Sequence, residues 1–80
     1  MSNFDCILEA QAIRDQLVGN QMLSWKMRID EAIEGGATGT EILMALRWTI
    51  AECLKENSDI APDVVARMKD YIMNANKLLG

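Results

Sequence analysis

Hydrophobic residues recur along most of this chain at the three- and four-residue spacing of an α-helix. Four such segments, about residues 3–18, 21–34, 40–56 and 62–79, are separated by short stretches that contain glycine, asparagine or serine. No segment shows the sustained alternation of hydrophobic and polar residues that marks a β-strand. We therefore expect an all-α protein: a small compact bundle of three to four antiparallel helices in a single domain, residues 1–80.

The ends of the first two segments are weakly marked. Ser2 or Asn3 can cap the first helix, with Asp5 in its first turn near the positive end of the helix. Gly19 then marks a break, because glycine readily adopts the left-handed conformation that ends a helix, and the asparagine after it can cap the next one. Since no proline separates the two segments, residues 3–34 form either two helices or one bent helix.

The last two segments have stronger end signals. The second segment stops at Gly35 and Gly36, and Thr38 with Glu41 three residues later forms the capping-box pattern that opens a helix. Pro62 suits the first turn of the last helix, because proline lacks an amide hydrogen and has a fixed φ. The last segment has the clearest hydrophobic face, which consists of Val64, Val65, Met68, Tyr71, Ile72, Ala75 and Leu79.

The third segment differs from the others because it is hydrophobic on two sides. Its main stripe consists of Ile42, Leu43, Leu46, Thr49, Ile50 and Cys53. At about 100° per residue, Met44, Trp48 and Ala51 fall on nearly the opposite side. Either the rest of the chain covers this second stripe, with Trp48 packed against the first helix, or another protein covers it. Trp25, by contrast, lies on the main face of the second segment and is expected in the core.

The second stripe has the composition of a protein contact, a large aromatic residue with charged neighbours. We place the contact on Met44, Arg47, Trp48, Ala51 and Lys55, made either to a second copy of the chain or to a target protein. A chain this short buries a limited share of its surface on folding. For this reason we expect a homodimer with the third helix near its centre.

The charge balance gives little support to a nucleic-acid or membrane partner. The 80 residues carry twelve acidic and eight basic side chains, a net charge of -4 and a pI near 4.6, whereas sequence-independent nucleic-acid binding depends on clustered lysine and arginine. One alternative stays open, a helical dimer in which Lys26 and Arg28 of both copies form a basic strip that binds nucleic acid. No hydrophobic run is long enough to span a membrane.

The residues that usually carry catalysis are sparse. The chain has no histidine, the side chain used most often for proton transfer near neutral pH and for metal binding. Carboxylate pairs such as Glu52 with Glu56 share a helix face but lie among polar neighbours, which is typical of a solvated surface. Cys6 and Cys53 lie on hydrophobic faces and are expected to be reduced core thiols. We expect no enzymatic activity, no cofactor and no metal.

The first residues lack the basic region and hydrophobic stretch of a secretory signal, so we expect a cytoplasmic protein. The function that best fits the sequence is a small non-catalytic protein-binding regulator or inhibitor that acts through a helical surface. An antagonist of a host protein complex, encoded by a phage or mobile element, would have this profile. The alternative is the nucleic-acid-binding helical dimer.

Overall fold

The computed structural model describes residues 4–80 and confirms the all-α class. Its elements are α1 (Cys6–Gln16), the short 3-10 helix η1 (Asn20–Met22), α2 (Leu23–Gly35), α3 (Gly39–Glu56) and α4 (Pro62–Leu79). The described residues contain no β-strand. Of the stretch expected to form either two helices or one bent helix, residues 4–34 contain two separate α-helices, α1 and nearly all of α2.

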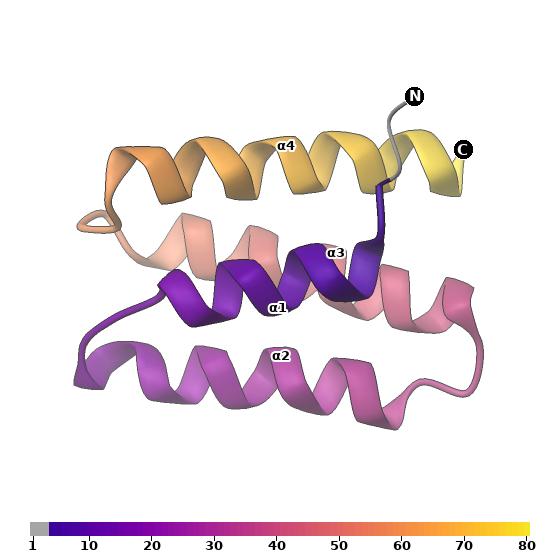
Figure 1. The fold of residues 1–80 in the computed structure, drawn as a ribbon, viewed down its shortest axis with the longest axis horizontal. Coiled ribbons are helices and arrows are strands. Elements are labelled where there is room, and N and C mark those ends of the chain that lie inside the picture. Colours follow the sequence, from indigo (N-terminus) through magenta and orange to yellow (C-terminus); the bar gives the residue numbers. More distant parts are fainter. Residues whose placement is uncertain (1–3) are drawn as a thin grey trace.

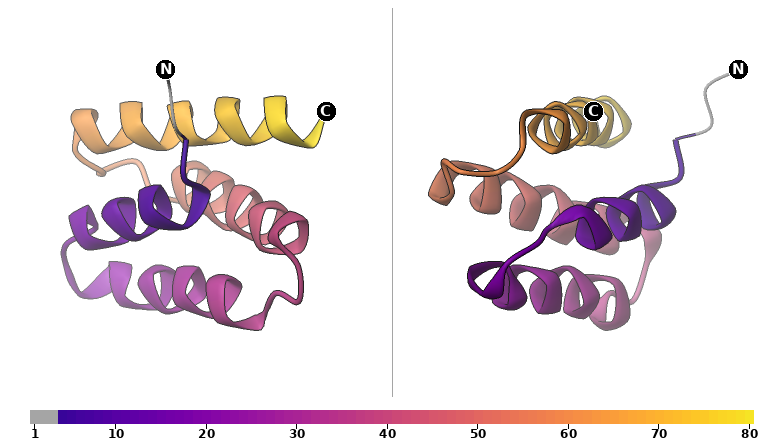
Figure 2. Two further views of the ribbon diagram at one scale, coloured as in Figure 1. Left: turned by 45° about the vertical axis from the view of Figure 1, so that its right-hand side comes forward. Right: turned by 60° about the vertical axis from the view of Figure 1, so that its left-hand side comes forward.

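The four α-helices surround one hydrophobic core. In the view of Figure 1, α4 lies above and α2 below, while α1 lies in front of the more distant α3. The two rotated views in Figure 2 show the same layering from the sides. The molecule measures 31 × 27 × 19 Å, and α1 and α3 lie on its two opposite broad faces. Because α3 packs mainly against α2 and α4, one of its sides is turned away from the rest of the chain.

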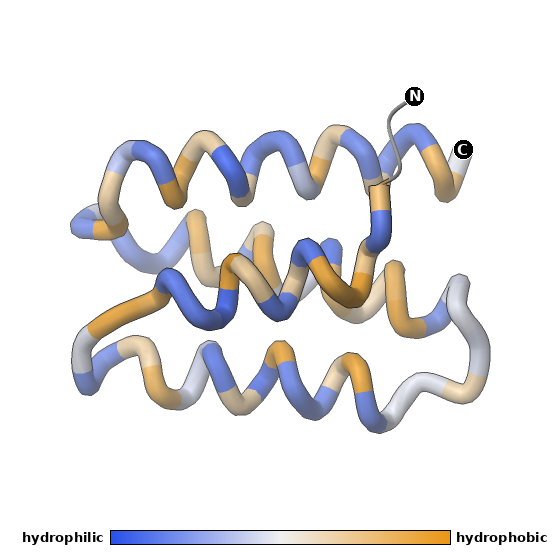
Figure 3. The backbone as a smooth tube through the Cα atoms, in the orientation of Figure 1, coloured by the Kyte–Doolittle hydropathy of each residue, from blue (hydrophilic) through white to orange (hydrophobic). Residues whose placement is uncertain are grey.

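Hydrophobic and hydrophilic residues alternate along each helix (Figure 3), and each helix contributes buried hydrophobic residues to the core. The buried hydrophobic residues are Ala10, Ile13, Leu17, Met22, Trp25, Ile29, Leu43, Leu46, Ile50, Cys53, Val64, Met68, Tyr71 and Ala75. The predicted core position of Trp25 is confirmed, and so is the face of α4 that centres on Met68 and Tyr71. The main stripe of α3 is also confirmed as its core side.

The first helix starts later than expected. The Asp5 carboxylate accepts hydrogen bonds from the backbone amides of Ile7 and Leu8, at 3.1 and 3.0 Å, and so caps a helix that begins at Cys6. The expected caps, Ser2 and Asn3, lie outside the described residues. Asp5 is therefore the cap itself rather than a residue of the first turn.

The connection between α1 and α2 contains more than a single capping residue. Helix α1 ends at Gln16, and Gly19 has a φ of +102°, which an L side chain rarely adopts. The positive φ at Gly19 agrees with the expected break, but Asn20 does not cap the next helix through its side chain. It begins η1, which leads directly into α2.

Thr38 caps α3 as the capping-box pattern predicts, but the amide that donates to the Glu41 carboxylate is that of Ala37 rather than that of Thr38. The Thr38 hydroxyl accepts a hydrogen bond from the Glu41 amide at 3.1 Å, and the Glu41 carboxylate accepts from the Ala37 amide at 3.4 Å. The connection from α2 is closely packed, because a Cβ on Gly36 would lie 2.2 Å from Cγ1 of Ile42. These contacts fix where α3 begins.

Polar contacts join α1 to both neighbouring helices. Arg14 donates to Asp30 of α2, and Arg67 of α4 donates to Glu9. The hydrogen bond from Arg67 lowers the pKa of the Glu9 carboxyl below its usual value. The Tyr71 hydroxyl also donates to the Cys6 carbonyl at 2.8 Å. Helix α1 is thus held by side chains of α2 and α4 in addition to its hydrophobic side.

No helix in the described part of the chain is long and hydrophobic enough to cross a membrane.

Candidate protein-contact surface

The side of α3 that faces away from the core carries the predicted contact residues. We call this surface the α3 outer face; it consists of Met44, Arg47, Trp48, Ala51 and Lys55. The side chains of Met44 and Trp48 are 49% and 60% exposed, and Lys55 is also exposed. Met44 and Trp48 are one helical turn apart, so they form a continuous hydrophobic patch on this face.

The two other predicted contact residues lie at the edge of this patch. The Arg47 guanidinium donates a hydrogen bond to the side chain of Asn76 at 2.9 Å, which directs it toward α4. Ala51 is only partly exposed. The outer face therefore has a hydrophobic centre at Trp48 and a partly covered margin on the α4 side.

The structure excludes one of the two interpretations of Trp48, the one that places its side chain in the core. Packing of Trp48 against the first helix is wrong, because α1 lies on the opposite broad face and the indole is exposed. The alternative in which the chain's own helices cover both sides of α3 is wrong for the same reason. A hydrophobic helix side left uncovered within the chain is a physical reason to look for another protein on it.

Several other large hydrophobic side chains are exposed that the sequence analysis did not single out. They are Leu8, Val18, Leu23, Met27, Met73 and Leu78. Leu23 and Met27 are one turn apart on α2 and form a second, smaller patch without an aromatic residue. The same helical spacing that identified Trp48 could have found this pair.

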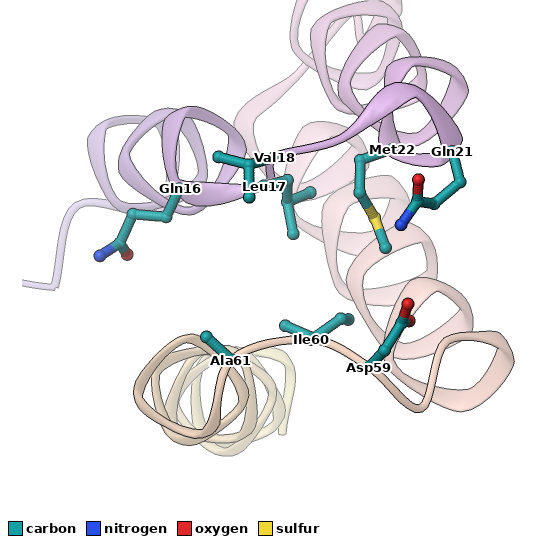
Figure 4. Close-up of a pocket in the computed structure, with 8 residues that line it drawn as sticks. All are labelled: Gln16, Leu17, Val18, Gln21, Met22, Asp59, Ile60 and Ala61. Atoms are coloured by element: carbon teal, nitrogen blue, oxygen red, sulfur yellow. The ribbon is translucent and has the colours of Figure 1, made fainter.

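A small pocket lies at one end of the bundle, between the α1–η1 connection and the α3–α4 connection. Leu17, Met22 and Ile60 line it, and the first two point toward the third (Figure 4). Its volume of about 50 Å³ compares with roughly 300 Å³ for the smallest usual ligand site. The pocket is too small for a typical organic ligand.

Neither the buried Cys53 of α3 nor the partly buried Cys6 of α1 has the low thiol pKa of a reactive nucleophile. Burial raises the pKa of the Cys53 thiol to about 11, and burial also raises the pKa of the Cys6 thiol. A nucleophilic cysteine needs the opposite shift, because the thiolate is the reactive form. Both thiols are free, and residues 4–80 contain no group of three potential metal-ligating side chains.

The basic residues of α2 do not form a strip within one chain. Lys26 and Arg28 are two positions apart and therefore point about 200° apart around the helix. The Arg28 guanidinium lies over the Trp25 ring, 4.7 Å from its centre. Part of the positive charge that a nucleic-acid surface would need is thus placed against a core aromatic residue.

Comparisons with models of protein families, with curated proteins and with solved structures found no match to this chain.

Proposed function

We propose that this protein is a small non-catalytic regulator or inhibitor that binds another protein chain through the α3 outer face. The observation that carries the proposal is the exposed pair Met44 and Trp48, on a helix whose other side is fully packed. Exposed tryptophan is costly to solvate and is enriched among residues that dominate binding energy. Charged residues beside the pair supply the polar rim that such contacts have.

The proposal includes three features expected from the sequence. Consecutive helices run antiparallel, the protein forms a homodimer, and it acts in the cytoplasm. The short connections between the helices and the uncovered side of α3 support the first two. The raised pKa values of both thiols support a function without nucleophilic catalysis.

Nucleic-acid binding by a helical dimer is the less supported alternative. Arg14 and Arg67 are engaged with carboxylates, and Arg28 lies over Trp25. Binding of this kind would weaken steeply with salt.

The proposal is tested with matched substitutions at two exposed hydrophobic positions. Trp48→Asp places a charge at the centre of the outer face, whereas Met73→Asp places one on the exposed side of α4, where Met73 is 52% exposed. Because both sites are exposed in the monomer, we expect both variants to keep the circular dichroism spectrum of the wild type.

The binding measurements combine light scattering over a dilution series with affinity capture from an extract of the cells that produce the protein. We expect at least one protein, either the second copy or a captured protein, to bind the wild type and Met73→Asp and to be lost with Trp48→Asp. The proposal is wrong if neither self-association nor any captured protein depends on Trp48.

A further inference from the structure

One line of side chains along the outside of α3 has a self-complementary order. The residues in this α3 stripe are Glu41, Met44, Trp48, Ala51 and Lys55. They are spaced by three and four residues, the spacing that keeps side chains on one side of a helix that pairs with another helix. Glu41 lies in the first turn of α3 and Lys55 in the last turn, so the two ends carry opposite charges. Trp48 is the middle position, seven residues from each end.

We propose that the α3 stripe pairs with the α3 stripe of a second copy, with the two helices antiparallel and Trp48 at the two-fold axis. This inference rests on the proposed function, because it names the chain that covers the same face. An antiparallel pair centred on Trp48 places each residue before it opposite the residue at the same distance after it in the other copy. Glu41 of each copy then faces Lys55 of the other.

Charge selects this orientation over the parallel one. Parallel helices would place Glu41 beside Glu41 and Lys55 beside Lys55, and like charges at an interface oppose association. The antiparallel pair replaces both repulsions with two ion pairs. Each copy carries a net charge of -4, so these pairs also offset the general repulsion between copies. The Glu41 carboxylate is exposed, and its hydrogen bond to the Ala37 amide is long, at 3.4 Å, so it can reach a second copy.

The hydrophobic residues match the same axis. The two Trp48 side chains meet at the centre. Met44 is four residues before Trp48 and Ala51 is three residues after it, so Met44 of one copy lies within one residue, about 1.5 Å along the helix, of Ala51 of the other, and a large side chain adjoins a small one. Helix α3 has 18 residues, which corresponds to about 27 Å of helix. Because the contact is limited to one side of a helix of this length, we expect an interface at the small end of the usual range. We therefore expect a dimer that dissociates on dilution.

The first experiment measures the dimer dissociation constant by sedimentation equilibrium for Lys55→Glu and for a matched control, Lys77→Glu. Both lysines are exposed and lie in the last turn of a helix, so the two variants change net charge and helix-end electrostatics alike. Lys55→Glu turns two attractive pairs into two repulsive ones, and we expect it to raise Kd by about tenfold. Lys77→Glu should leave Kd within about twofold of the wild type, and adding Glu41→Lys to Lys55→Glu should restore dimerisation.

The second experiment reports the orientation by disulfide formation, with Cys6→Ala in every chain. In the antiparallel pair, the two copies of position 41 lie about 21 Å apart along the helix, beyond the reach of a disulfide. A mixture of Glu41→Cys and Lys55→Cys chains should therefore form cross-linked dimers on oxidation. Neither variant should cross-link when oxidised alone.

Three results would overturn the inference. They are a wild type that stays monomeric throughout the dilution series, a dimer that is indifferent to Lys55→Glu, and efficient cross-linking of Glu41→Cys alone, which indicates parallel helices. A monomer that still captures a protein in a Trp48-dependent manner would remove the second copy as occupant while leaving the proposed function intact. A protein that neither self-associates nor captures another protein through Trp48 would remove both proposals.

Discussion

At the scale of single residues, the two tryptophans occupy opposite environments. Trp25 is 7% exposed and lies under the Arg28 guanidinium, whereas Trp48 is 60% exposed on the α3 outer face. The hydrophobic spacing in the sequence predicts that each tryptophan lies on a hydrophobic side of its helix. It does not specify whether the rest of the chain packs against that side. That depends on which broad face of the bundle α3 occupies, which is a property of the whole packing arrangement.

The ion pairs that join α1 to α2 and α4 also could not be predicted from the sequence. Arg14 and Asp30 are 16 residues apart, and Arg67 and Glu9 are 58 residues apart. Charged residues three or four positions apart can be paired from sequence, because helical geometry brings them together. Pairs between helices require the mutual positions of the helices, which the hydrophobic pattern does not specify.

Tyr71 gives a residue-scale prediction at alkaline pH. Burial raises its pKa well above the usual value of about 10. Above that pH an unfolded tyrosine loses its proton while the folded one keeps it, so the free energy of unfolding should fall as pH rises past about 10. Tyr71 is the only tyrosine, so phenolate absorbance near 295 nm reports this residue alone.

The measurement compares the absorbance titration with circular dichroism across the same pH range. We expect phenolate to form only as helicity is lost. A phenolate signal with a midpoint near pH 10 in a protein that is still helical would contradict the prediction. Tyr71→Phe is the control: it should lose about 1 kcal/mol at neutral pH with the Cys6 hydrogen bond, and show a smaller alkaline decline.

At the scale of elements, the helices with local start signals were predicted closely. The capping box at Thr38 and the proline at position 62 mark the starts of α3 and α4, because both signals act within one helical turn. The start of α1 was misplaced, since Ser2, Asn3 and Asp5 are all good capping residues. The edge-on packing of Phe4 against Tyr71 fixes where the chain enters this helix, and that is a contact across the bundle.

The Asp5 cap gives a prediction at this scale. Asp5→Ala removes the acceptor for the Ile7 and Leu8 amides and should lower the free energy of unfolding by about 1 kcal/mol. Asp5→Asn keeps a side-chain oxygen that can accept the same hydrogen bonds, so it should retain most of this stability. Urea denaturation at neutral pH measures both variants. Equal losses in both would show that the charge at Asp5, rather than capping, provides its contribution.

At the scale of the whole molecule, the core that stabilises the fold and the surface proposed for dimerisation consist of different residues. The radius of gyration is 11.8 Å, close to the roughly 11.6 Å expected of a folded chain of this length. The core residues come from all four α-helices of one chain, and none lies on the α3 outer face. In the proposed dimer, a second copy therefore adds to the stability of a folded monomer and is not needed to complete its core.

Thermal unfolding tests whether the proposed dimerisation adds stability to a chain that also folds as a monomer. For the wild type we expect Tm to rise by roughly 3 to 5 °C for each tenfold increase in concentration above Kd, because a second copy binds the folded chain alone. Trp48→Asp should melt at a concentration-independent Tm. Differential scanning calorimetry at several concentrations makes the comparison, and a wild-type Tm that does not change with concentration would contradict the prediction.

The closely packed connection at Gly36 also affects how α3 meets another protein. Ile42 of α3 packs directly against the Gly36 backbone and leaves no space for a side chain there, so the connection restricts rotation of α3 about its own axis. Thr38 and Asn57 hold the two ends of the helix, the latter by donating to the Cys53 carbonyl at 2.8 Å. The outer face is thus presented in a preorganised state, and a binding chain would lose little free energy to ordering it.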